Sequence, residues 1–183
     1  PAPPPDRPRP QPPTPPRSPP RPRDGTVTCY ADHPDYPPIS HGLARLRTAD
    51  RVVFHNGIGF DYPALAMIYG DDVMDRNLIW DSLIVSRLVQ PTGRRHGLAA
   101  WGEQLGFPKG DYDDWSRFTP EMGAYCDQDV VVTTKVYQHL QTLIDYTLGA
   151  AIQLEHDFAW VIHLQEQHGF RLDVDAAQAL AVE

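Results

Sequence analysis

The sequence has little cysteine, no long apolar run and no excess of basic residues. Its two cysteines, Cys29 and Cys126, share no spacing typical of a metal or redox site, so we expect free, buried thiols in a reducing compartment. No apolar run reaches the roughly 20 residues that a membrane-spanning helix needs. No signal-peptide pattern opens the chain. These absences favour a cytoplasmic protein that has no membrane partner.

The formal net charge of −8 argues against a protein that binds nucleic acid through a broad basic surface. It does not exclude an enzyme that acts on DNA. A metal-dependent nuclease concentrates carboxylates at its centre, and bound cations reverse the charge there. Basic residues near such a centre would then hold the phosphates.

The first segment, residues 1–25, has the composition of a tail. Thirteen of the 20 prolines precede Asp24 and alternate with five arginines. Such a segment cannot bury apolar area, and we expect it to be disordered with polyproline-II character. It is interpreted as an uninformative tail, although its PxxP-like spacings leave open a ligand for an aromatic-lined groove.

From Thr26 onward, strand and helix patterns alternate, which predicts an α/β fold with at least part of its sheet parallel. Strands are expected at 26–30, 51–55 and 78–80. Helices are expected at 39–46, 62–69, 82–89, 98–105, 120–143 and 150–168, and from the capping residue Asp173 onward. Because the chain stops inside this last amphipathic helix, it has the character of a fragment.

The strongest chemical signal lies on the long helix. Its apolar stripe runs through Met122, Cys126, Val136, Leu140 and Leu143. Tyr125 and Asp129 stand four residues apart, so they share one face beside that stripe. A carboxylate in that position is costly unless a cation or several donors satisfy it. A metal ion is one such partner; the alternative is a neighbouring backbone group or arginine.

A second signal follows the strand at 51–55. Glycines permit a tight path here, and Asp61 arrives at the start of the next helix. Taken alone, Asp61 is interpreted as a helix cap and Asn56 as a turn residue. Asp81 is expected to cap its own helix. His156, His163 and His168 share one helix and are interpreted as surface or packing residues.

Together the two signals resemble the second and third motifs of the DEDDy 3′–5′ exonucleases, and specifically those fused to phage-type family-A DNA polymerases. The resemblance covers roughly Val53 to Ala181. Its segments are Phe54–Leu65, Asp81–Leu88, His96–Leu98, Trp101–Gly110, Phe118–Met122, Tyr125–Val130 and Leu154–Phe170.

This resemblance implies a ribonuclease-H-like (DnaQ-like exonuclease) fold that lacks its first strand and is followed by C-terminal helices. Residues 26–148 would be a partial exonuclease domain, and residues 149–183 would begin the polymerase region. The implied setting is a bacterial or phage-infected cell. The implied partners are the 3′ end of single-stranded DNA and the remainder of a polymerase chain.

The same resemblance implies the roles of the site residues. Asp129 would bind the first Mg²⁺ or Mn²⁺, Asp61 would hold the second through water, and Tyr125 would position the attacking water. Asn56 and Phe60 would contact the terminal nucleotide. Three basic residues could hold DNA phosphates, with scattered surface charges as the alternative. They are Arg94, Arg95 and Lys109.

The family's first motif, a strand with Asp-x-Glu, does not occur before Val53. We expect that the proline-arginine stretch replaces the true start of the domain, through a frameshift, a misassigned start codon or gene decay. Val27–Tyr30 would then be an exposed sheet edge. The alternatives are a catalytically inactive remnant that serves as a DNA-binding or interaction module, and a ribonuclease of the same superfamily.

Overall fold

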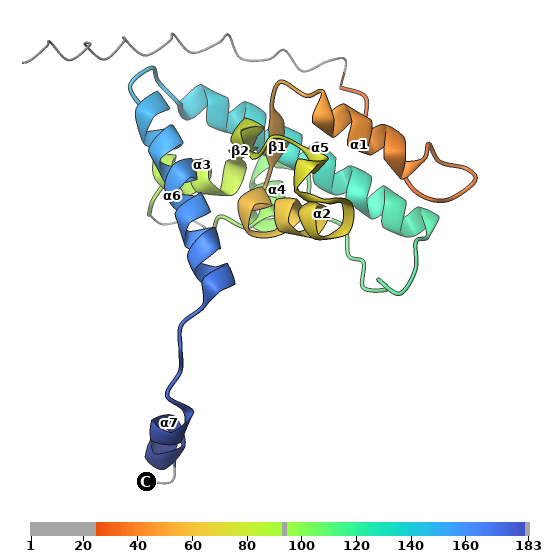
Figure 1. The fold of residues 1–183 in the computed structure, drawn as a ribbon. Helices are drawn as coiled ribbons and strands as arrows, with labels where there is room; N and C mark the ends of the chain where they lie inside the picture. The colour runs from red at the N-terminus through yellow and green to blue at the C-terminus, as the bar shows by residue number, and fades with distance from the viewer. Residues whose placement is uncertain (1–24, 93–94, 182–183) are drawn as a thin grey trace, which may run out of the picture.

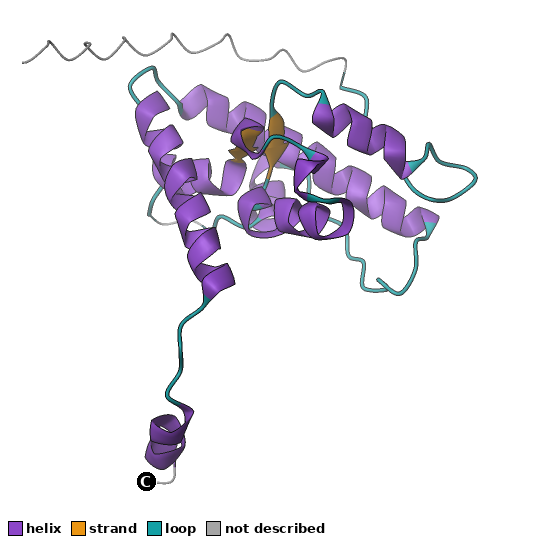
Figure 2. Cartoon of the chain, in the orientation of Figure 1, coloured by secondary structure: helices purple, strands orange, loops and turns teal. Residues whose placement is uncertain are grey.

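The computed structural model describes residues 25–92 and 95–181, and this part is mostly helical around a small parallel sheet (Figures 1 and 2). The longer elements are α1 (Ile39–Arg47), β1 (Val52–Phe54), α2 (Tyr62–Tyr69), β2 (Ile79–Asp81), α3 (Ser82–Val89), α4 (Leu98–Leu105), α5 (Pro120–Leu143), α6 (Gly149–His168) and α7 (Val174–Ala181). Three short turns of helix complete the described part: η1 (Gly57–Asp61), η2 (Asp71–Val73) and η3 (Arg76–Leu78). The expected α/β character and parallel strand pairing are therefore confirmed, in a sheet of two strands within the described residues.

The sheet consists of β1 and β2, which run parallel with Val53 opposite Trp80. Side chains alternate between its two faces, so Val53 and Trp80 join one apolar cluster while Val52 and Ile79 join another. Helices cover both faces, which explains why these strands are continuous apolar runs rather than alternating ones.

The long helix α5 supplies one wall of the core and crosses the body behind the sheet (Figure 1). Val132, Val136 and Leu140 are fully buried on it and pack with Trp80 and Trp101. Val136 and Leu140 were predicted core positions. The same prediction was wrong for Cys126 and Leu143, which are exposed, because Cys126 borders a cavity and Leu143 is the last residue of the helix.

Helix ends follow the capping residues in the sequence. The Thr119 hydroxyl accepts a hydrogen bond from the Met122 N–H at 3.1 Å, and Pro120 occupies the first helical position of α5. Gly106 ends α4 with a left-handed φ of 75°. The predicted bounds of α4 and α5 are confirmed at both ends.

The predicted strand at Thr26–Tyr30 is wrong. In the described residues this segment belongs to no sheet. Tyr30 instead packs on α1, where its ring lies against Gly42 and its hydroxyl accepts a hydrogen bond from Arg45 at 2.8 Å. Because side-chain contacts with a helix hold the segment, Val27–Tyr30 is not the sheet edge we expected.

The two cysteines are free thiols, as expected, but neither is buried. Cys29 is partly exposed and Cys126 is exposed. Partial burial raises the pKa of both thiols, and the carboxylates of Asp127 and Asp129 add to this at Cys126.

The C-terminal helices differ in their packing. α6 packs against α3 and η1, whereas α7 follows an extended segment and every residue in it is exposed (Figure 1). Asp173 caps α7 as predicted, through its carboxylate and the Ala176 N–H at 3.1 Å. None of the helices within 25–92 and 95–181 is long and apolar enough to cross a membrane.

Candidate functional site

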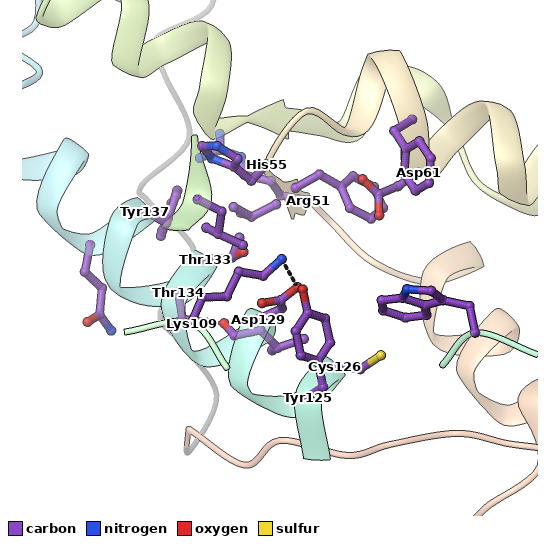
Figure 3. Close-up of a pocket in the computed structure, with 17 residues that line it drawn as sticks. Arg51, His55, Asp61, Lys109, Tyr125, Cys126, Asp129, Thr133, Thr134 and Tyr137 are labelled. Carbon is purple, nitrogen blue, oxygen red and sulfur yellow. Dashed lines mark hydrogen bonds and ion pairs between the residues drawn. The ribbon is translucent and has the colours of Figure 1, made fainter. Parts of the chain in front are cut away.

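A cavity of about 760 Å³ lies between the end of β1, the η1 turn and one face of α5. Five of the residues predicted from the sequence line it, although they come from three separate segments of the chain (Figure 3). They are Phe60, Asp61, Lys109, Tyr125 and Asp129.

The η1 turn carries Phe60 and Asp61, and Asp81 at the end of β2 holds it in place. Asp81 is 1% exposed, and its carboxylate accepts hydrogen bonds from the N–H groups of Asn56 (2.9 Å), Ile58 (3.1 Å) and Leu83 (3.0 Å). The Leu83 bond is the predicted cap of α3. The other two bonds, which the sequence did not indicate, fix the turn that leads to Asp61.

His156 on α6 contacts the backbone of Asp81. Its Nε2 accepts a hydrogen bond from the Asp81 N–H at 2.8 Å, so its Nδ1 carries the proton and donates to the Ile152 carbonyl at 2.8 Å. The side chain is only 6% exposed. The sequence left open whether His156 is a surface residue or a packing residue. Its burial shows that it is a packing residue.

The turn itself needs unusual backbone geometry. Asn56 adopts a left-handed φ of 70°, which agrees with its prediction as a turn residue. A Cβ at Gly57 would lie 2.3 Å from the Phe54 Cβ, so only glycine fits there.

Asp61 stands at the start of α2, but its side chain makes no capping hydrogen bond, so its interpretation as a cap was wrong. Its carboxyl group instead lines the cavity. Burial raises the pKa of Asp61 to about 6, and the negative charges of Asp81 and Asp129 also raise it. A cation in the cavity would relieve this unfavourable ionisation.

Asp129 faces the cavity from α5 and is paired with Lys109. The Lys109 ammonium lies 2.9 Å from Asp129 Oδ2 and 4.7 Å from the centre of the Tyr125 ring (Figure 3). Burial lowers the pKa of Lys109, but hydrogen bonds to Tyr125 and Asp129 outweigh it and the pKa is raised. The other oxygen, Asp129 Oδ1, is buried and has no hydrogen-bond partner.

Two further polar atoms of cavity-lining residues are buried without a partner: His55 Nε2 and the Tyr137 hydroxyl. The other ring nitrogen of His55 lies 2.8 Å from the Ser82 hydroxyl. Burial lowers the pKa of His55. Because buried polar groups rarely lack partners, three such atoms around one cavity favour a polar ligand there.

Aromatic rings border the cavity. Phe60 is 69% exposed and Trp115 is 56% exposed, and both line it. Trp115 meets Tyr125 edge-on at 5.5 Å and Tyr112 at 5.1 Å between ring centres. Exposed aromatic faces beside a cavity are suited to stacking on a flat ligand such as a base.

Three of the predicted nucleic-acid contacts are not among the residues that line this cavity. Asn56 is exposed on the turn. Arg95 is 83% exposed and forms an ion pair with Glu103 at 3.4 Å, which agrees with the surface-charge alternative. Arg94 lies outside the described residues.

The two carboxylates that line the cavity, Asp61 and Asp129, offer oxygen ligands, the type that Mg²⁺ and Mn²⁺ prefer. The carboxylates of Asp61 and Asp129, with the unpartnered Oδ1 of Asp129, fit a divalent cation in donor type. Within the part of the chain that the structure describes, no group of three or more His, Cys, Asp or Glu side chains is placed to hold a metal ion.

Comparison with known proteins finds similarity to two phage DNA polymerases. The chain is 29% identical to the DNA-directed DNA polymerase of Escherichia phage T7, over 84% of its own length and 31% of the polymerase. It is 30% identical to the DNA-directed DNA polymerase of Enterobacteria phage T3, over 76% of its own length and 28% of the polymerase. This chain is similar to phage DNA polymerases. It spans less than a third of either phage polymerase, and no protein-family model matches it.

Sequence reasoning missed several residues that line this cavity. Arg51, Trp115 and Thr133 line it, and no pattern in the sequence marks Arg51 or Trp115. Thr133 stands four residues after Asp129, so helical periodicity could have placed it on the same face.

Proposed function

We propose that this chain is the 3′–5′ exonuclease portion of a phage-type family-A DNA polymerase, which removes nucleotides from the 3′ end of single-stranded DNA during replication. The observation that carries the proposal is that Asp61, Tyr125 and Asp129 line one cavity, from the η1 turn and from α5. These are the residues to which the resemblance assigns metal binding and catalysis. The similarity to two phage polymerases supports the same setting.

The domain organisation follows from this proposal. Residues 26–148 would form the exonuclease part with a ribonuclease-H-like arrangement, and residues 149–183 would begin the polymerase region. The bond between His156 and Asp81 would then link the first polymerase helix to the turn that carries Asp61.

In the proposed mechanism, Asp61 and Asp129 would hold Mg²⁺ or Mn²⁺. The bound metal would activate the attacking water and stabilise the leaving 3′-oxygen. Tyr125 orients the water from the neighbouring turn of α5, since it stands four residues before Asp129. Phe60 packs against the terminal base, and Lys109 faces the phosphate.

A second candidate function is a DNA-binding module that does not hydrolyse its ligand. The ion pair between Lys109 and Asp129 favours it, because the ammonium already neutralises the carboxylate that would hold the metal. In that case the cavity would bind a 3′-terminal nucleotide through its aromatic rings and unpartnered polar atoms.

The experiment that separates the two candidates uses 5′-labelled single-stranded DNA incubated with the purified chain and Mn²⁺. The exonuclease proposal predicts a ladder that shortens from the 3′ end and disappears in Asp129→Ala. Asp127→Ala is the matched control, because Asp127 neighbours Asp129 on α5 but does not line the cavity. If the folded protein binds the DNA without shortening it, hydrolysis is excluded and the binding module remains.

A further inference from the structure

The backbone that leads to Lys109 is anchored to two helices. The Phe107 N–H donates to the Gly102 carbonyl at 2.8 Å, and the Gln128 side chain donates to the Pro108 carbonyl at 3.0 Å. A Cβ at Gly102 would lie 2.6 Å from the Phe107 carbonyl oxygen, so this approach requires glycine. The loop is therefore fixed to α4 and to α5 immediately before and beside Lys109.

The fixed loop brings the ammonium to the carboxylate that a metal would need. Lys109 Nζ lies 2.9 Å from Asp129 Oδ2, and the two side chains are only 26% and 27% exposed. A divalent cation on Asp129 would come within a few ångströms of this ammonium. Two positive charges at that distance repel each other strongly in a partly buried site.

We propose that Lys109 is a built-in counter-ion that occupies Asp129 in the metal-free protein and is displaced when a divalent cation binds. This inference rests on the proposed function for the identity of the site, and it adds how the site is controlled. Once released, the ammonium remains beside Tyr125, at the same end of the cavity, where it can contact a phosphate of the DNA. The Lys109 ammonium thus leaves the Asp129 carboxylate and contacts a DNA phosphate, so Lys109 acts as a positioning residue.

The first test is the binding of Mn²⁺ to the chain without DNA, measured by titration calorimetry or by the loss of the free-ion electron paramagnetic resonance signal. Lys109→Met keeps the length of the side chain and removes its charge. It should bind Mn²⁺ at least about tenfold more tightly than the unmodified protein, because a competing positive charge is gone. Asp129→Asn should abolish the gain.

The chain offers a matched control, since its sequence contains only two lysines. Lys135 also stands on α5, but it does not line the cavity, and its ammonium is over the Phe107 ring, 5.1 Å from the ring centre. Lys135→Met should leave the Mn²⁺ affinity unchanged. Circular dichroism and urea unfolding would establish that each variant is folded.

The second test needs no substitution. Acetylation of lysine by a small amine-selective reagent, followed by mass spectrometry, reports on the accessibility of each ammonium. Adding Mn²⁺ should speed the acetylation of Lys109 several-fold and leave Lys135 unchanged, whereas Mn²⁺ should have no effect on Asp129→Asn.

Equal Mn²⁺ affinity of the Lys109→Met variant and the unmodified protein, including no binding by either, would overturn the inference. A rate of Lys109 acetylation that does not change when Mn²⁺ is added would also overturn the inference. Failure of the proposed function looks different: the protein would show the expected competition for Mn²⁺ and still leave a single-stranded DNA 3′ end intact.

Discussion

Replacing Asp81 with asparagine should loosen the turn that carries Asp61, even though Asp81 does not line the cavity. The Asp81 carboxylate is buried and accepts three backbone N–H groups, from Asn56, Ile58 and Leu83. Two of these donors belong to the turn. An asparagine can present only one oxygen, so at least one donor must face the amide NH₂ group instead.

The structure identifies the bond that is lost. Oδ1 accepts from Asn56 and Leu83, whereas Oδ2 accepts from Ile58 alone, so the amide group will face the Ile58 N–H. A buried donor without a partner costs about 1–3 kcal/mol, and the two surviving bonds lose their charge assistance, about 1 kcal/mol each. Relief of the buried charge offsets part of this. We expect Asp81→Asn to lower the free energy of unfolding by about 3 kcal/mol.

The assay combines urea unfolding with hydrogen exchange of the Asn56 and Ile58 amides, whose protection should fall by tenfold or more. The control is Asp75→Asn, because Asp75 caps η3 in an exposed position and asparagine caps equally well there, so its cost should stay below about 0.5 kcal/mol. The reasoning fails if Asp81→Asn costs less than 1 kcal/mol and both amides keep their protection.

Three other substitutions test the fold and the site. His156→Leu removes the acceptor for the Asp81 N–H and should cost about 1–3 kcal/mol in urea unfolding; no loss would mean that this bond does not hold α6. Leu140→Ala opens a cavity in the fully buried core and should cost about 2–5 kcal/mol by thermal unfolding, so a smaller change would show a loosely packed α5. Because the pKa of Asp61 is raised from 3.8 to about 6, its ionisation disfavours the folded state, and the stability it contributes is lost as pH rises through this range. Asp61→Asn should therefore stabilise the protein at pH 7 by up to about 3 kcal/mol and make no difference below about pH 4; an equal effect at both pH values would contradict the assigned pKa.

The sequence predicted the helices well because their ends are marked by local chemistry. Thr119 and Pro120 begin α5, and Gly106 ends α4, through capping and backbone effects that need no tertiary context. The strand predicted at Thr26–Tyr30 failed for the opposite reason. A short apolar segment becomes a strand only if another strand pairs with it, and Tyr30 packs on α1 instead.

The candidate site was predictable in part. Position alone indicated a helix cap at Asp61 and left the partner of Asp129 open, so it was the resemblance to the exonuclease motifs that pointed to Asp61, Tyr125 and Asp129, which line one cavity. The pairing of Lys109 with Asp129, and the bond between His156 and Asp81, depend on how distant segments pack together. No spacing within the sequence encodes such contacts, so only the folded chain reveals them.

The measurement that tests the central claim most directly is photo-crosslinking of single-stranded DNA that carries one photoreactive base, at either its 3′ or its 5′ end. The claim predicts that the 3′-terminal base crosslinks to peptides that contain Phe60, Trp115 or Tyr125, and that the 5′-terminal base does not. Mass spectrometry of the crosslinked peptides identifies the contact independently of any hydrolysis. Equal crosslinking from both ends, or crosslinks confined to peptides away from this cavity, would contradict the claim that the cavity receives a 3′ end.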